Sequence, residues 1–340
     1  MKLRDFIIRR LLLAIPVILG VLLITFILSY IVGDPIALYT SERTRPEAIA
    51  AIRAAHGLDQ PIPIQFLYYI GSLLRGDWGY SRTAHLDVID AIKVFFPATA
   101  ELSIAAIIIA VVVGIPLGII SATRKDKMVD HVTRVFSLAG VSMPIFWFAL
   151  ILKYVLFFQF SQMGLPHLPS GGRYTEYLHY TPITGFVLID SLITGNFALF
   201  FDAFAHIIMP AIALGYLSLA IITRMMRSSM LEVLGEDYIT LARSKGLSER
   251  VVIYRHALRN ALIPTVTVIG LAFGGLLAGA VLTETIFSWP GLGRWSTQSI
   301  MGSDIPSISA FVLIVAIVFV AANLLVDLVY GTLDPRIRFG

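Results

Sequence analysis

The segment Leu11–Val32 reads LLLAIPVILGVLLITFILSYIV, a run of 22 residues without a charged side chain. A helix needs about 20 consecutive apolar residues to cross the hydrocarbon core of a bilayer. The apolar part of a cleaved secretory signal is shorter, roughly 7–15 residues, and a small-residue cleavage site follows it. No such site follows Leu11–Val32. We therefore predict that this run is a retained membrane-spanning helix.

The rest of the chain repeats this pattern. Of its 340 residues, 57% are hydrophobic and 14% are charged, whereas charged residues make up about 25% of soluble proteins. Five further runs are long enough to span a bilayer: Ala98–Ser121, Val135–Phe158, Ile207–Ile222, Leu262–Phe287 and Ser309–Tyr330. We expect the fourth helix to begin at Met209-Pro210, since a proline is tolerated in the first turn. The sequence therefore predicts an all-α membrane protein with six transmembrane helices.

Charge placement decides the topology. The run Ile183–Phe201 also has sufficient length, but it contains Asp190, and a carboxylate at the bilayer centre costs roughly 2.5–3.5 kcal/mol. Lys and Arg accumulate in cytoplasmic loops. With six spans and a cytoplasmic N-terminus, one such loop holds seven basic residues: Arg224, Arg227, Arg243, Lys245, Arg250, Arg255 and Arg259. A seventh span at Ile183–Phe201 would place them outside. We therefore predict six spans in the cell membrane with both termini cytoplasmic.

This topology divides the chain into four parts. They are the N-terminal tail and first helix (1–32), a large extracytoplasmic region (33–97), a core of five helices with a cytoplasmic loop at 224–260 (98–332), and a cytoplasmic tail (333–340). In the second part, Arg45–His56 is predicted to form a short helix that starts at Pro46 and ends at Gly57.

The two long segments predicted to lie on the extracytoplasmic side carry several aromatic residues. Trp78 and Tyr80 lie in the first segment, and Tyr174 and Tyr177 lie in the second. Aromatic side chains of this kind either anchor a protein at the membrane interface or form a docking surface for a partner. Both interpretations remain open at this stage.

The loop between the fourth and fifth spans has clear helix signals. Glu236 and Asp237 suit a helix N-terminus, and Arg243 and Lys245 suit its C-terminus. Gly246 can take the left-handed conformation that ends a helix, and Ser248 is predicted to cap a second one. Helix, glycine and helix make a compact protrusion. It either sits in a groove on a partner protein or lies on anionic lipid.

The segment Glu236–Pro264 resembles the EAA-type coupling loop of binding-protein-dependent ABC permeases. In that signature a small residue, three variable positions and a glycine precede a later proline, and Ala242, Gly246 and Pro264 fill these places. Thr240 and Leu241 replace the first two letters of the signature's name, and with this replacement the loop resembles the oligopeptide/dipeptide branch of the family. Further stretches resemble that branch in order along the chain: GDWGYS (Gly76–Ser81), PATAEL (Pro97–Leu102), SMPIFW (Ser142–Trp147), IFSWPGLG (Ile286–Gly293) and LDPRIR (Leu333–Arg338).

The resemblance implies a permease subunit of an importer for short peptides. Its partners would be a second, homologous permease, two ATP-binding subunits that carry ATP and Mg²⁺, and an extracytoplasmic solute-binding protein, with no cofactor on this chain and no nucleic acid. The ATPase-coupling residues would be Glu236, Asp237, Tyr238, Leu241, Ala242, Arg243, Ser244, Lys245, Gly246 and Leu247. An oligosaccharide or nickel cargo for the same machinery remains an alternative.

Four residues of the spans are candidates for a pathway or gate. Gly274 and Gly275 permit close helix packing, which serves either a pathway or packing alone. Glu284 either attracts a cationic substrate or makes an interfacial hydrogen bond, and Lys153 either contacts substrate or extends to the interface. An ion channel or secondary transporter would need charges in mid-span, and apart from Lys153 the spans offer almost none.

Other chemistries find no support in the sequence. The chain has no cysteine, its seven histidines lack metal-ligand spacing, and no Gly-rich phosphate-binding loop with its Lys-Ser/Thr is present. We therefore expect no metal site and no ATP hydrolysis by this chain. Finally, Pro290 and Gly291 occupy the positions that predict a type II turn at Trp289–Leu292.

Overall fold

The computed structural model describes residues 3–32, 36, 45–55 and 57–333. Within these ranges the regular secondary structure is helical apart from one antiparallel pair of two-residue strands, β1 (Tyr80–Ser81) and β2 (Leu86–Asp87). Six helical segments are long and apolar enough to cross a membrane: Ile8–Tyr30, Val88–Thr123, Ile145–Gln162, Phe197–Leu234, Glu249–Leu276 and Ile305–Leu325. The predicted all-α fold with six spanning helices is confirmed.

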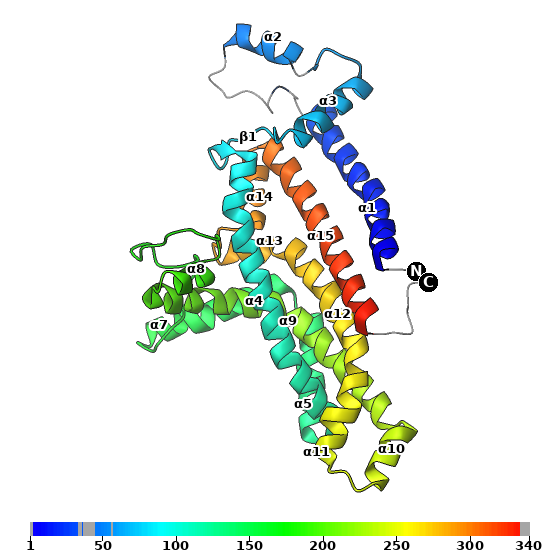
Figure 1. Cartoon of the computed structure of the whole chain (residues 1–340). Helices are drawn as coiled ribbons and strands as arrows, with labels where there is room; N and C mark the ends of the chain where they lie inside the picture. Colours follow the sequence, from blue (N-terminus) through cyan, green and yellow to red (C-terminus); the bar gives the residue numbers. More distant parts are fainter. Residues whose placement is uncertain (1–2, 33–35, 37–44, 56, 334–340) are drawn as a thin grey trace.

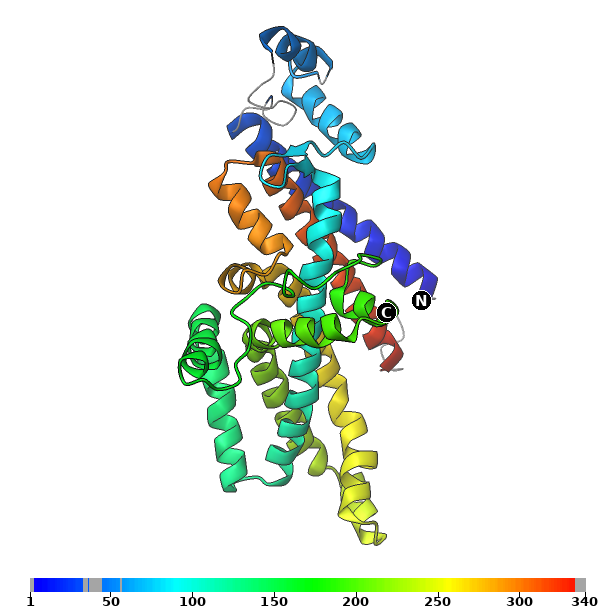
Figure 2. The same ribbon diagram turned by 90° about the vertical axis from the view of Figure 1, so that its left-hand side faces the viewer.

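The helices form an elongated bundle, shown in two views in Figures 1 and 2. Helices α1 (Leu3–Phe26) and α15 (Ile305–Leu333) run side by side and pack through Phe26 and Leu313. The short helices α2 (Pro46–Ala55) and α3 (Ile62–Leu74) lie at one end of the molecule, at the top of Figure 1. The predicted helix start at Pro46 is confirmed, and Gly57 follows with φ +63°.

The centre of the bundle is the contact between α4 (Val88–Thr123) and α9 (Phe197–Leu234). Glycines set the closeness of this contact. A Cβ atom on Gly118 would lie 2.6 Å from Cβ of Met226, and one on Gly215 would lie 2.7 Å from the Ala106 carbonyl oxygen. Small residues of this kind allow membrane helices to approach backbone to backbone. The α4–α9 pair is therefore the central contact of the bundle, and α5, α6, α8 and α12 pack against it.

The third run differs from its prediction as one helix, Val135–Phe158. The structure divides it into α5 (Met128–Ser142) and α6 (Ile145–Lys153), which a π-helical stretch and α7 (Phe160–Gln162) extend. The break lies at Pro144, which forces Met143 into an extended conformation with φ −88° and ψ 126°. A residue before proline disfavours helical angles, and this restriction explains the break.

The fourth helix begins earlier than predicted. α9 starts at Phe197, and the Asn196 side chain caps it by accepting a hydrogen bond from the Leu199 N–H at 3.1 Å. Pro210 therefore lies inside the helix, and the expected start at Met209-Pro210 is wrong. The polar residues before Pro210 are compensated by tertiary contacts. Asp202 accepts hydrogen bonds from the backbone N–H and hydroxyl of Thr175, both at 2.7 Å.

The apolar run Ile183–Phe201 is not a continuous helix, which agrees with its rejection as a span. It holds the short helix α8 (Val187–Ile193) and the first turns of α9. Asp190 is buried, which by itself raises the pKa of its carboxyl group. Hydrogen bonds from Thr184, the Ile183 N–H and Tyr180 outweigh that effect and lower the pKa to about 2. The carboxylate therefore organises the loop before α8.

The fifth run, predicted as Leu262–Phe287, also divides. α12 (Leu258–Gly279) ends before α13 (Val281–Ile286), and α14 (Leu292–Met301) follows. The predicted type II turn is wrong, because Gly291 has φ −108° and the left-handed residue is Ser288 at φ +50°. A Cβ on Gly291 would lie 2.4 Å from the Glu284 carboxylate. Glycine is required there for space. The predicted tail after Leu333 lies outside the described residues.

Candidate docking site

The predicted coupling loop forms a protrusion at the end of the molecule remote from α2 and α3 (Figures 1 and 2). It consists of α10 (Asp237–Ser244), a turn, α11 (Glu249–Val251) and a π-helical stretch, Val252–Ala257, that continues into α12. We call residues 236–257 the protrusion. The predicted helix–glycine–helix order is confirmed, and the second helix continues as α12 (Leu258–Gly279), which contains Pro264.

One face of α10 holds the protrusion to the bundle. Ile239 is fully buried and Ala242 is buried, and both belong to an apolar cluster with Met226 and Met230 of α9 and with Val252. Because its side chain packs inward, Ala242 is not available to a partner, although the family signature includes it. A small residue there lets α10 lie close to the bundle. The base of the protrusion is therefore part of the core.

The turn between the helices depends on Gly246. Its φ is +74°, and the space around a Cβ atom at this position is open. The requirement is therefore conformational, since other residues adopt the left-handed region only at a cost. Its N–H donates to the Arg243 carbonyl oxygen at 2.9 Å. Ser248 stands at the start of α11 as predicted, but its side chain makes no capping hydrogen bond.

Two side-chain contacts fix the shape of the protrusion. The Arg243 guanidinium donates two hydrogen bonds to Glu249, with Nε–Oε2 at 3.2 Å and Nη2–Oε1 at 2.7 Å, and so bridges the Gly246 turn. The Tyr238 hydroxyl accepts a hydrogen bond from Asn260 Nδ2 at 2.7 Å, which joins α10 to α12. An exposed ion pair contributes little to stability. Its effect here is to fix the geometry of the turn.

The outward face of the protrusion mixes apolar and charged groups. Leu241 and Tyr254 are each 55% exposed, and Tyr238 and Leu247 are each 39% exposed. The protrusion also carries exposed charged and polar side chains: Glu236, Asp237, Arg243, Ser244 and Lys245. Aromatic and apolar side chains together with polar ones are the usual composition of a protein interface. The face is therefore suited to a protein partner.

Three of the four candidate pathway or gate residues contact other helices of the chain, and Gly275 is exposed. Lys153 Nζ donates to the Ile286 carbonyl oxygen at 2.8 Å and so joins α6 to α13. Glu284 is fully buried and accepts hydrogen bonds from the Thr99 hydroxyl at 2.7 Å and the Arg294 N–H at 3.0 Å. Gly274 faces Ala322 of α15, whereas Gly275 has open space around it. The structure does not bring these four residues into one site.

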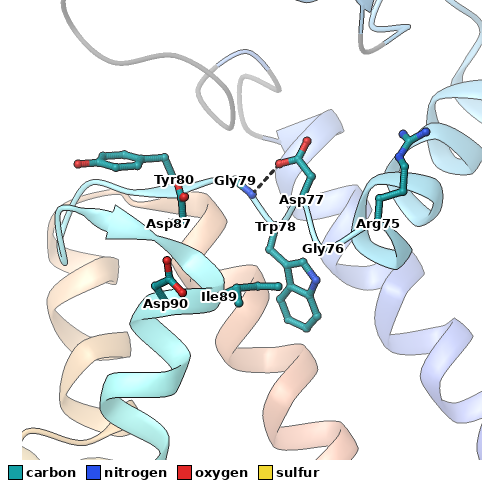
Figure 3. Close-up of a pocket in the computed structure, with 9 residues that line it drawn as sticks. All are labelled: Arg75, Gly76, Asp77, Trp78, Gly79, Tyr80, Asp87, Ile89 and Asp90. Atoms are coloured by element: carbon teal, nitrogen blue, oxygen red, sulfur yellow. Dashed lines mark hydrogen bonds between the residues drawn. The ribbon is translucent and has the colours of Figure 1, made fainter. Parts of the chain in front are cut away.

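The four aromatic residues proposed for docking fall into two places. Trp78 and Tyr80 line a pocket of about 510 Å³ near β1, together with Asp77, Asp87 and Asp90 (Figure 3). Trp78 is half-buried, and its indole N–H donates to the Leu73 carbonyl oxygen at 3.1 Å. Figures 1 and 2 place the loop before α8 at a different level of the molecule.

In that second loop, Tyr174 is half-buried against Tyr180, with ring centroids 5.3 Å apart. Tyr177 is 84% exposed. Of the four, Tyr80 and Tyr177 are exposed, and Tyr80 is 43% exposed.

Two buried ion pairs were missed from the sequence. Glu101 of α4 accepts hydrogen bonds from Arg173 Nε and Nη2 at 2.9 and 2.6 Å, and Asp130 of α5 accepts two from Arg227 of α9 at 2.7 and 2.8 Å. The hydrogen bonds from Arg227 and Ser121 hold the pKa of Asp130 well below its usual range. The sequence signal for such a pair is a carboxylate within an apolar run, as at Glu101. Among the described residues, no three His, Asp or Glu side chains are grouped to hold a metal ion.

Comparison with known proteins agrees with this architecture along the whole chain. Residues 114–339 match the family described as the binding-protein-dependent transport system inner membrane component, and residues 3–103 match the N-terminal region of such components. The chain belongs to this family. It is a membrane permease subunit of a binding-protein-dependent ABC importer, and its six apolar helices make it a multi-pass membrane protein.

Individual relatives of this permease are similar over nearly their full length. The dipeptide transport system permease protein DppB of Escherichia coli K12 is 47% identical over 339 residues, covering 98% of each chain. The di/tripeptide permease DppB of Pseudomonas aeruginosa UCBPP-PA14 is 47% identical over 336 residues, again 98% of each. The glutathione permease GsiC of Salmonella choleraesuis is 34% identical over 336 residues, covering 98% of this chain and 99% of the relative.

Proposed function

We propose that this permease imports short peptides and that its protrusion docks on an ATPase subunit on the cytoplasmic side. The observation that carries the peptide assignment is the 47% identity, over 98% of each chain, to permeases named for dipeptides and for di- and tripeptides. The relative named for glutathione, which is itself a peptide, points the same way. An oligosaccharide or nickel cargo has no comparable support among these relatives.

The proposed assembly pairs this chain with a second, homologous permease, two ATP-binding subunits and an extracytoplasmic solute-binding protein. ATP and Mg²⁺ belong to the ATP-binding subunits. Two features support the coupling role of the protrusion. Its base is fixed in the core through Ile239, and its outward face presents Leu241 and Leu247 to a partner. A rigid base transmits movement of the partner to α9 and α12, and rigid-body motion of helices is a common switching mechanism.

The topology follows from charge. Placing the protrusion and the basic residues around it inside the cell satisfies the positive-inside rule, and six spans then place both termini in the cytoplasm. Helices α2 and α3 and the strand pair lie at the opposite end of the molecule (Figure 1). We therefore propose that residues 33–97 are extracytoplasmic and that Tyr80 and Tyr177 contact the binding protein.

Reconstitution tests this function. The five proposed components in proteoliposomes should take up dipeptides and tripeptides in the presence of ATP, and peptide-loaded binding protein should stimulate ATP hydrolysis. Oligosaccharides and Ni²⁺, offered with the same binding protein, should do neither. Uptake of an oligosaccharide or of Ni²⁺ in place of peptides would refute the cargo, and peptide uptake that proceeds without ATP would refute the coupling.

A further inference from the structure

A second pocket lies between α5 and α9 and has no part in the proposed function. Its volume is about 300 Å³, and it is lined by Arg134, Ser137 and Leu138 of α5 and by Arg224 and Arg227 of α9, with two threonines. Ligand pockets in proteins typically measure about 300–1,000 Å³. The pocket is therefore large enough for a small polar group.

The charge of this pocket is positive. Arg227 is neutralised by its two hydrogen bonds to Asp130. Arg134 is exposed beside the ring nitrogen of His131, and Arg224 is exposed and makes no ion pair with any described residue. None of the residues that line the pocket is acidic. Two guanidinium groups are thus left to an anion, and arginine matches the geometry of phosphate oxygens.

A buried hydroxyl group in the pocket wall also lacks a partner. Ser137 is 6% exposed, and its Oγ atom makes no hydrogen bond with the described part of the chain. Buried polar atoms are usually paired, so an orphan of this kind needs an explanation. Thr223 Oγ1 is also unpaired, but it lies toward Gly114 of α4. Ser137 lines the pocket, and its hydroxyl has no competing partner among the described residues.

An apolar strip leads away from the pocket along α5. Val135, Leu138 and Val141 follow one another at three-residue intervals and are 68%, 64% and 40% exposed. Residues spaced in this way share one face of a helix. A free phosphate would use the arginines alone, whereas a phospholipid supplies an anionic phosphate and an acyl chain together. Basic pockets between membrane helices are known to bind anionic headgroups.

We propose that the pocket between α5 and α9 binds the phosphate of an anionic phospholipid, held by Arg134, Arg224 and the Ser137 hydroxyl, with an acyl chain along the α5 strip. The site requires membrane residence only, so it does not depend on the peptide cargo or on ATPase docking. A basic side chain near an anionic membrane surface contributes a factor of about five in affinity, and two contribute about 25-fold.

Native mass spectrometry of the delipidated full-length chain tests the proposal. Phosphatidylglycerol, phosphatidylcholine and inorganic phosphate are titrated separately. Phosphatidylglycerol should bind the wild-type chain at least tenfold more tightly than the zwitterionic phosphatidylcholine, and millimolar inorganic phosphate should not displace it. Arg134→Gln with Arg224→Gln should remove most of this preference, about 25-fold. Ser137→Ala should weaken phosphatidylglycerol binding alone.

The matched control is Arg53→Gln, which removes an exposed arginine from α2 at the other end of the molecule and should leave the preference unchanged. A cryo-electron microscopy map of the wild-type chain in phosphatidylglycerol nanodiscs needs no variant and should show a headgroup between Arg134 and Arg224. Equal affinity for the two lipids, an unchanged preference in the double variant, or an empty pocket in that map would overturn the proposal. Displacement by inorganic phosphate would overturn the lipid as its source.

Discussion

Two residues of α10 that are two positions apart separate the structural role of the protrusion from its proposed docking role. Ile239 is fully buried against α9, whereas Leu241 is 55% exposed. Alanine is the best helix former, so replacing either residue with alanine preserves the helix. The two variants remove apolar contacts of opposite kinds: one inside the chain and one toward the proposed ATPase.

The expected magnitudes follow from burial. Ile239→Ala should lower the free energy of unfolding by about 2–5 kcal/mol, because it leaves a cavity in the core. Leu241→Ala should leave that free energy nearly unchanged. Complete burial of a leucine contributes about 1.5–3 kcal/mol, and roughly half of the Leu241 side chain remains to be buried. We therefore expect Leu241→Ala to lose about 1 kcal/mol of binding free energy, which raises the dissociation constant for the ATPase about fivefold.

Thermal unfolding in detergent and ATPase binding by the purified permease measure the two effects. Leu241→Ala should weaken ATPase binding and peptide-stimulated ATP hydrolysis with no change in unfolding temperature. Leu192→Ala on α8 is the matched control, since it removes a leucine side chain that is 52% exposed from another helix. If Leu241→Ala binds the ATPase as tightly as wild type, or if Leu192→Ala weakens binding equally, the docking argument is refuted.

Three further predictions concern the turn, the buried ion pair and the close contact at α14. Gly246→Ala should destabilise the turn by about 1 kcal/mol. Gly246→Pro should abolish peptide-stimulated ATP hydrolysis, because proline fixes φ near −65°. Intact hydrolysis by the proline variant would contradict this prediction. Arg227→Gln leaves the Asp130 carboxylate buried without a counter-charge, and should lower the free energy of unfolding by about 3–5 kcal/mol at pH 7. Because the pKa of Asp130 is depressed in the folded state, the stability that this ion pair contributes is present above about pH 4 and is lost as the pH falls through the folded-state pKa. The difference in unfolding temperature between Arg227→Gln and wild type should therefore narrow below pH 4. A difference that stays constant with pH would argue against the ion pair. Gly291→Ala should destabilise the chain by about 1–3 kcal/mol, because the added Cβ would lie 2.4 Å from the Glu284 carboxylate. Gly275→Ala is the control and should not destabilise the chain, because the space around Gly275 is open. Equal unfolding temperatures for the two variants would refute the steric argument.

Much of the fold follows from patterns that act locally. The number of spans depends on run length, and the start of α2 at Pro46 and the end of α10 near Gly246 depend on backbone angles that proline and glycine set. Such signals are present in a few adjacent letters. The shape of the protrusion was therefore predictable before its packing was known.

The errors arose where tertiary contacts overrule local patterns. The predicted start at Met209-Pro210 rested on the tolerance of a first helical turn for proline, but α9 extends back to Phe197, and Thr175 from a distant loop donates hydrogen bonds to Asp202 within that extension. Gly291 fitted a turn pattern, but the Glu284 carboxylate above it decides its conformation. The inward orientation of Ala242 also depends on the packing of α9 against α10. No single stretch of sequence contains these pairings.

Site-directed crosslinking tests the central claim most directly, because the chain has no cysteine of its own. Leu247 of the protrusion and Tyr177 of the loop before α8 are both exposed. Each can therefore be replaced by a single cysteine. In the assembled importer, Leu247→Cys should crosslink to the ATPase, and Tyr177→Cys should crosslink to the binding protein and never to the ATPase. An ATPase adduct at Tyr177→Cys, or none at Leu247→Cys, would contradict the account.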